Sequence, residues 1–409
     1  METHYINYKI PKEAEGTYFS IPFPVPANLE RITVSYQYES GVIDLGLMGA
    51  QENFLGWSGG ARSSVWVDPH SATPGYCMVP ITPGEWQILV GAYKIPPNGV
   101  EVRYTIEYHP QAPRWLKGDL HMHSDASDGQ HNIPTLAKIA GRKNLDFIAV
   151  ANHNNYNENF NLPKISGLTL IPAVEWTHYK GHMNFYGVAA PFNNFIANNE
   201  EEMLALVNRA KEKGALISVC HPMDKGCGYL WQNRDIFDMV EVWNGPMRPT
   251  NVNGIKWWHE LLLEGKKIPL IGGSDYHRGL FPIIMAHPTT HVYAKSPCTS
   301  DILNALKNGH AYVTSSPNGI NIDLKSGEAM MGDTVPWRTG LTLDVSTQKL
   351  GVGMKVRLVT SEGIINLQNG QQQVQALPSW KFAYIVIVRK ILNFERIAAI
   401  SNPIYIIHK

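Results

Sequence analysis

Histidine and acidic side chains stand at the carboxyl ends of successive apolar runs, and this placement constrains the fold more than any other feature of the chain. The run Phe147–Val150 is followed closely by His153, and Leu216–Cys220 by His221. Parallel strands connected by helices end at one rim, so the side chains that follow them converge. Converging imidazoles and carboxylates predict a site for several metal ions.

Paired ligands at alternate positions mark two further strand ends. His121 and His123 are two residues apart, as are Asp275 and His277. Side chains at such positions point to the same face of a strand, so both members of a pair can reach one ion. An isolated pair of this kind would be weak support for a metal site, because alternating histidines also occur on solvated strands.

The remaining ligand candidates come from the loops and the buried runs. Glu175 follows a run of mostly apolar residues, where an unpaired carboxylate would cost several kcal/mol, so it needs a cation. Asp128 precedes Gly129, which allows a sharp turn inward, and is preferred to Asp125 as a ligand. Nine ligand candidates result: His121, His123, Asp128, His153, Glu175, His182, His221, Asp275 and His277.

The order of secondary-structure patterns predicts an α/β protein with three regions. Residues 1–113 have alternating, β-branched runs typical of a β-sandwich or jelly roll. Residues 114–325 alternate strands with helices, as in Glu200–Lys213, and predict a parallel sheet closed or nearly closed into a barrel. Residues 326–409 return to β-like runs and are expected to form a small β-rich appendage.

The bulk composition excludes several classes of function. The chain has 409 residues and a formal net charge of zero, so nothing suggests attraction to nucleic acid or to an anionic membrane. No stretch reaches the ~20 apolar residues of a membrane-spanning helix. No signal peptide is visible, and a cytoplasmic protein is expected. The four cysteines are too few for a disulfide framework and show no CxxC spacing.

Seven segments resemble the PHP family, the polymerase and histidinol phosphatase metallohydrolases. They are Asp-Leu-His121-Met-His123-Ser, Ser-Asp128-Gly, Ala-Asn-His153-Asn, Val-Glu175-Trp, Gly-His182, Val-Cys-His221-Pro and Gly-Ser-Asp275-Tyr-His277. They occur in the family's order over residues 115–325, about half of the chain. The flanking β regions and the short spacing from Glu175 to His182 are similar to the branch of carbaryl hydrolase-like enzymes.

The resemblance implies a distorted (β/α)7 barrel that holds two or three divalent ions of zinc, manganese or iron. Carried over by motif, one ion would be held by His121, His123, Glu175 and Asp275. A second would be held by Glu175, His182 and His221, and a third by Asp128, His153 and His277. The chain departs from the family at Asn152, where an Asp is usual. An amide beside His153 would make that imidazole less basic and the third ion more weakly bound.

The expected activity is hydrolysis of a small phosphate ester by a metal-bridging hydroxide. Asp275 or His221 would transfer a proton, and Arg278 would bind a phosphate or serve as a surface cation. Asn244, Lys180 and Arg278 are the candidate substrate contacts, with Arg248 considered beside them. A carboxylic ester or carbamate hydrolase is the alternative, which an apolar pocket walled by Trp176 and Trp243 would favour. A barrel that binds metal or ligand without catalysis is the third possibility.

Overall fold

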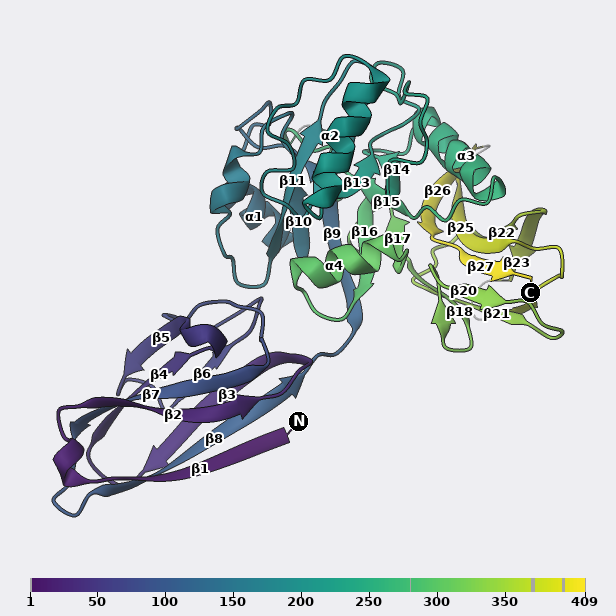
Figure 1. Ribbon diagram of the computed structural model, residues 1–409. Helices are drawn as coiled ribbons and strands as arrows, with labels where there is room; N and C mark the ends of the chain where they lie inside the picture. Colours follow the sequence, from purple (N-terminus) through teal and green to yellow (C-terminus); the bar gives the residue numbers. More distant parts are fainter. Residues whose placement is uncertain (1, 280, 369–371, 392–393, 409) are drawn as a thin grey trace. The chain divides into compact units, whose positions relative to one another are not determined.

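A computed structural model describes residues 2–279, 281–368, 372–391 and 394–408 (Figure 1). The chain divides into two compact units. The first comprises residues 1–113 with the short segments 164–167 and 295–298. The second comprises residues 114–163, 168–294 and 299–409. The predicted boundary between 325 and 326 does not coincide with a division between these units, and the separate appendage remains a prediction.

The first unit is built from two antiparallel sheets around one apolar core. Alternate residues of the strands are buried, for example Ile32 and Val34 in one sheet and Ile21 and Phe23 in the other. The period of two places one face of each sheet inward. One sheet has the order β1 (Glu2–Ile10), β8 (Val100–Pro110), β3 (Leu29–Tyr38) and β6 (Ser64–Val67); the other has β2 (Tyr18–Val25), β7 (Gly84–Lys94), β4 (Val42–Met48) and β5 (Phe54–Gly59).

Seven neighbouring strands form one end of the second unit's large sheet. They lie side by side in chain order, and the first and last are joined by the backbone bonds from Asp275 N to His121 O and from His123 N to Tyr276 O. The strands are β9 (Arg114–Met122), β10 (Phe147–Val150), β11 (Thr169–Trp176), β12 (Met183–Tyr186), β13 (Leu216–Val219), β14 (Met239–Asn244) and β15 (Leu270–Gly273).

One strand of this series runs against the others. β12 pairs antiparallel with β11 and with β13, whereas the other neighbours in the series pair in parallel. The beginning of β12 therefore lies at the edge where β11 and β13 end. His182 immediately precedes β12, so the reversed strand delivers its ligand at the same edge as the others.

The regular alternation of strand and helix that the sequence predicted is incomplete. The helices are α1 (Ile133–Arg142), α2 (Glu200–Glu212), α3 (Pro249–Leu263) and α4 (Thr299–Lys307), with short 3-10 turns at Lys12–Ala14, Ala50–Glu52 and Asn157–Asn161. No helix is found between β13 and β14, where every residue is described. The connection there begins Cys-His-Pro-Met-Asp-Lys-Gly-Cys-Gly, and its Pro and Gly residues disfavour a helix.

The helices that do form have clear sequence causes. The side chain of Asn199 caps α2 by accepting a hydrogen bond from Glu202 N. Three acidic residues occupy its first turn and basic residues its last, which matches the helix dipole. Leu206 on α2 and Trp258 on α3 belong to the core cluster that covers strands β11 to β15.

The remaining strands continue the large sheet and add a smaller one. β17 pairs with β26, so the C-terminal strands are joined to the strands that carry the predicted ligands. No described helix has the length and apolarity needed to span a membrane. The further strands of the large sheet are β16 (Thr289–Ala294), β17 (Ala311–Thr314), β20 (Thr334–Pro336), β22 (Met354–Thr360), β23 (Gly363–Leu367), β25 (Phe382–Ile391), β26 (Phe394–Ser401) and β27 (Ile404–Ile407); the smaller sheet has β18 (Asn321–Ser326), β19 (Ala329–Met330), β21 (Thr342–Gln348) and β24 (Gln372–Gln375).

His291 on β16 should make stability depend on pH. Its ring is buried against Tyr312, and burial, with Lys117 and Lys349, lowers its pKa from 6.5 to about 3. In the unfolded chain this histidine takes up a proton once the pH falls below its ordinary pKa, whereas in the folded chain it stays neutral. The stability that neutral, buried His291 contributes is therefore fully present above pH 6.5 and is lost as the pH falls toward about 3.

Replacing His291→Gln keeps a partner for Thr314 and should flatten the acid side of the stability curve by ~1.4 kcal/mol per pH unit within that window. Urea unfolding of both proteins at several acid pH values measures the difference. Parallel curves would show that His291 takes up its proton in the folded state as readily as in the unfolded chain.

Candidate metal centre

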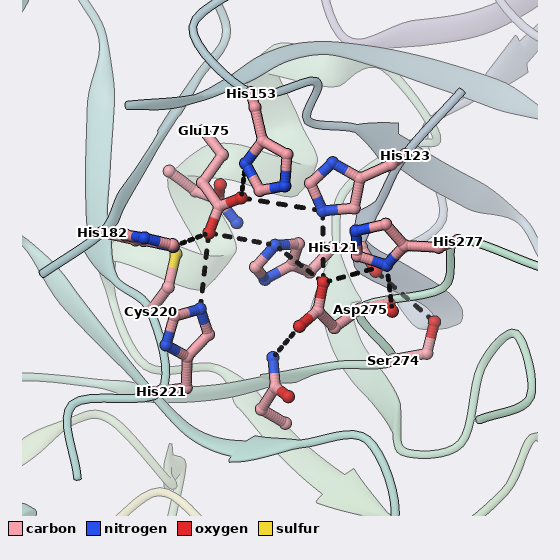
Figure 2. Close-up of polar contacts among 12 residues, drawn as sticks. His121, His123, His153, Glu175, His182, Cys220, His221, Ser274, Asp275 and His277 are labelled. Atoms are coloured by element: carbon pink, nitrogen blue, oxygen red, sulfur yellow. Dashed lines mark hydrogen bonds and ion pairs between the residues drawn. The ribbon is translucent and has the colours of Figure 1, made fainter. Parts of the chain in front are cut away.

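Glu175 is the centre of the site, with five histidines around it (Figure 2). The side chain lies at the end of β11 and is only 1% exposed. Its Oε2 lies 2.7 Å from His153 Nδ1 and 3.6 Å from His123 Nε2. Its Oε1 lies 2.9 Å from His182 Nδ1 and 3.4 Å from the Nε2 atoms of both His121 and His221. One buried carboxylate thus contacts imidazoles delivered by the ends of four other strands.

Asp275 supplies a second carboxylate beside the first. Its Oδ1 lies 3.1 Å from His123 Nε2 and 3.6 Å from His121 Nε2. Asp275 has a φ of 52° and His221 a φ of 30°, in the left-handed region that residues other than glycine rarely adopt. Such strain is common where the surrounding structure fixes a side chain for function. Here it points both residues into the cluster.

Asp128 adds a third carboxylate to the cluster through His277 and His153. Its carboxylate lies 3.3 Å from His277 Nε2 and 3.5 Å from His153 Nε2. A Cβ at Gly129 would stand 2.3 Å from the carbonyl oxygen of His123, so only glycine fits where the loop folds back. All nine predicted ligand residues therefore lie in one network of contacts. Their individual roles as ligands remain predictions.

Two buried acids that the sequence reasoning missed hydrogen-bond to ligand residues or to the backbone next to them. Glu241 on β14 is 1% exposed and lies 3.0 Å from His121 Nδ1 through Oε1, while its Oε2 accepts from His221 N at 3.2 Å. Asp119 accepts hydrogen bonds from the backbone of Ser274 and Ala286. Glu241 stands within an apolar run, as Glu175 does, and the same signal could have identified it.

The protonation preferences of the cluster follow from burial and charge together. Burial by itself lowers the pKa of His121, but Glu241, Glu175 and Asp275 outweigh it and hold the pKa well above its usual value. Burial likewise opposes the shift at His221, whose pKa is also raised well above the ordinary value by its contacts with Cys227 and Glu175. The histidines hold the pKa of Glu175 well below normal despite burial. The buried carboxylates thus stabilise positive charge, whether on the histidines or on a bound cation.

Metal ions would satisfy the nitrogen and oxygen atoms of the cluster better than hydrogen bonds among these atoms do. Within the cluster, His121 Nε2, His123 Nδ1 and Glu175 Oε2 are buried and make no well-aligned hydrogen bond, although Oε2 lies 2.7 Å from His153 Nδ1. The rings of His123 and His277 stack with centroids 4.1 Å apart, so protonating both would place two charges in contact. Divalent ions can take the place of these protons and satisfy the same lone pairs. Groups of donors within 4.8 Å of one another include His123, Asp128, His153 and His277, and also His121, His123 and Asp275.

The predicted substrate contacts have mixed outcomes. Asn244 is buried and its Nδ2 lies 3.3 Å from Asp275 Oδ2, so it reaches the cluster. The Lys180 ammonium lies 5.0 Å from the ring centre of Trp231. Arg278 is exposed, and its side chain has no ion pair or hydrogen bond among the described residues. Its proposed catalytic role therefore has no contact to support it.

The tryptophans considered as an aromatic wall are buried in the core. Trp176 is fully buried and Trp243 is 2% exposed. The ring of His178 lies 5.3 Å from the Trp176 indole and nearly parallel to it, and Trp231 contacts both rings, at 4.8 Å from His178 and 6.0 Å from Trp176. Of these three rings, only that of His178 is partly exposed, because Trp231 is buried like Trp176.

No protein-family model matches the sequence, and no curated protein does. The structure is similar to a two-domain protein from Bacteroides vulgatus that contains a predicted PHP-like metal-dependent phosphoesterase, with 19% identity, a TM-score of 0.43, and 71% of this chain and 96% of that chain covered. An amidohydrolase from Chromobacterium violaceum matches with 13% identity and a TM-score of 0.25, over 41% of this chain and 93% of that one. At these identities and scores, the function has to be inferred from the residues of this chain.

Asn152 does not hold His153, contrary to the role considered for that position. Its Oδ1 accepts from Ser124 N at 2.8 Å, and its Nδ2 donates to Glu158 Oε2 at 2.8 Å. His153 Nδ1 instead lies 2.7 Å from Thr177 Oγ1. The amide is suited to this place because it accepts on one side and donates to a carboxylate on the other.

Placing an acid at this position, Asn152→Asp, should therefore destabilise the protein. A new carboxylate would face Glu158 with only the single proton of the Ser124 hydroxyl to share between them, at a cost of ~1–3 kcal/mol. Urea unfolding of the metal-free protein measures this cost, and Glu158→Gln in the same chain should remove most of it. An Asn152→Asp variant as stable as the parent would contradict the assigned contacts.

Proposed function

We propose that the chain is a metal-dependent hydrolase that acts on a small phosphate ester. The observation that supports the proposal best is Glu175, a carboxylate that is 1% exposed and contacts five histidines. A core that only needed stability would gain little from such a group, because desolvating so many polar side chains is costly. Metal binding explains why they are gathered.

The residues divide into donors for up to three ions. His121, His123, Glu175 and Asp275 would hold one ion. Glu175, His182 and His221 would hold a second. Asp128, His153 and His277 would hold a third. Ions of zinc, manganese or iron at such sites activate water and stabilise the negative charge that develops during hydrolysis.

The side chains around the cluster have separate tasks in this proposal. Asp275 can accept or return a proton at Oδ1, with Asn244 fixing its other oxygen at 3.3 Å. Glu241 holds His121 through Nδ1 and keeps its Nε2 directed at Glu175. His221 is the second candidate for proton transfer.

A cation near Asn244 favours an anionic substrate. Arg248 Nη2 lies 3.3 Å from Asn244 Oδ1, and the Nδ2 atom of the same Asn244 side chain lies 3.3 Å from Asp275 Oδ2. Its guanidinium has no carboxylate partner among the ion pairs of the described residues, so it can turn to a phosphate oxygen. We therefore assign phosphate recognition to Arg248 in place of Arg278.

A carboxylic ester or carbamate is the second candidate substrate. The ring of His178, half-buried and tilted at 40° to the buried Trp231, could receive an aromatic leaving group. Lys180 stands over Trp231 and would then screen that surface.

We also propose that the seven strands β9 to β15 form the distorted barrel of the PHP family. The hydrogen bonds between residues 121–123 and 275–276 support closure, and the systematic placement of ligands at strand ends supports the family. The reversed β12 and the missing helices are then the distortion.

Arg248→Ala tests the substrate class. Losing a charge-assisted contact of about 1.5–3 kcal/mol should lower kcat/KM for a phosphomonoester roughly 10- to 100-fold. Hydrolysis of the matching acetate ester should be unchanged. Rates of 4-nitrophenyl phosphate and 4-nitrophenyl acetate, measured with zinc, manganese and iron in turn, give the comparison.

Lys256→Ala is the control, because Lys256 is an exposed cation on α3, the helix that begins directly after Arg248. Acetate hydrolysis without phosphatase activity would favour the second candidate. A protein that binds the ions and hydrolyses neither ester would favour a binding barrel.

A further inference from the structure

His221 and His121 contact Glu175 in the same way. Each presents Nε2 to Glu175 Oε1 at 3.4 Å, and their rings lie 25° from parallel. Each therefore has Nδ1 turned away from the shared carboxylate. A metal-bound histidine commonly donates its other N–H to a nearby acceptor, which fixes both the tautomer and the ring.

The two histidines differ in what holds Nδ1. For His121 the partner is the buried carboxylate of Glu241, at 3.0 Å. For His221 it is the sulfur of Cys227, at 3.4 Å. The same sulfur lies 3.5 Å from Asp224 Oδ1, which also accepts from Gly226 N at 2.8 Å. A neutral thiol can accept from His221 and donate to Asp224, so every proton in this chain has an acceptor.

The loop after β13 folds back to make this contact. Tyr229 N donates to Pro222 O at 2.8 Å, which closes the loop on the residue next to His221. A Cβ at Gly228 would stand 2.5 Å from the carbonyl oxygen of Asp224, so this close turn requires glycine. The fold-back brings Cys227 beside the ring of a residue six positions earlier.

We propose that Cys227 is a positioning residue for the second metal ion: it accepts the Nδ1 proton of His221 and so fixes Nε2 toward Glu175. This inference rests on the proposed metal centre. A thiol is a weaker acceptor than the carboxylate that holds His121. The ion at His182 and His221 is therefore the more weakly bound of the two that share Glu175.

Zinc binding by the full-length chain tests the role of Cys227. Competition with a chelator gives the number of bound ions and the affinity of each. Cys227→Ala should weaken one ion by about 10- to 100-fold and leave the others unchanged. Cys227→Ser should recover part of the loss, because a hydroxyl can also accept. The unfolding midpoint of the metal-free protein should not move.

The matched control is Cys77→Ala, which removes an exposed thiol from the first unit and should leave every affinity unchanged. Zinc X-ray absorption separates the roles that the thiol could have. We expect nitrogen and oxygen neighbours that are the same in the parent and in Cys227→Ser. A sulfur neighbour at about 2.3 Å that disappears in Cys227→Ser would make Cys227 a direct ligand and overturn the proposal.

Unchanged zinc affinity in Cys227→Ala would also overturn it, while leaving the metal centre intact. Failure of the parent protein to bind zinc, manganese or iron would instead contradict the proposed function on which it rests.

Discussion

The structure of the second unit depends on one electrostatic constraint, the need of buried Glu175 for positive charge. A carboxylate removed from water in this way must be neutralised or paired. The chain meets that need with histidines placed at the ends of several strands, and with Asp275 and Asp128 to balance them. Because the imidazoles come from four different strands, the cluster can form only when the strands are assembled. The position of each ligand side chain thus depends on the order and direction of the strands in the sheet.

A second layer of polar groups keeps these side chains in place. Glu241 holds His121, Cys227 holds His221, and Thr177 contacts His153. Asp119 joins the turn after β15 to β9 through Ser274, and the left-handed backbone at Asp275 follows from that turn. Outer partners of this kind set ligand orientation and therefore metal affinity. The protein has built this layer from a carboxylate, a thiol and a hydroxyl.

Much of the site could be predicted because its signals are local. Glu175 follows an apolar run and His221 ends another, so burial and strand direction together indicate where the side chains meet. The same signal, an acid inside an apolar run, could have identified Glu241. The partners of Cys227 and Asn152 were not, because both depend on loops folding back across the rim, and loop paths are set by tertiary contacts. The reversal of β12 was also hidden, since a short buried strand has the same pattern in either direction.

Metal content measured by elemental mass spectrometry on gently purified protein, beside a variant carrying His121→Ala and Asp275→Ala, tests the central claim most directly. The account predicts two or three equivalents of zinc, manganese or iron in the parent protein and a clear loss in the variant. Parent protein that is free of metal and cannot be reloaded with any of the three would contradict it, and the cluster around Glu175 would then need another explanation.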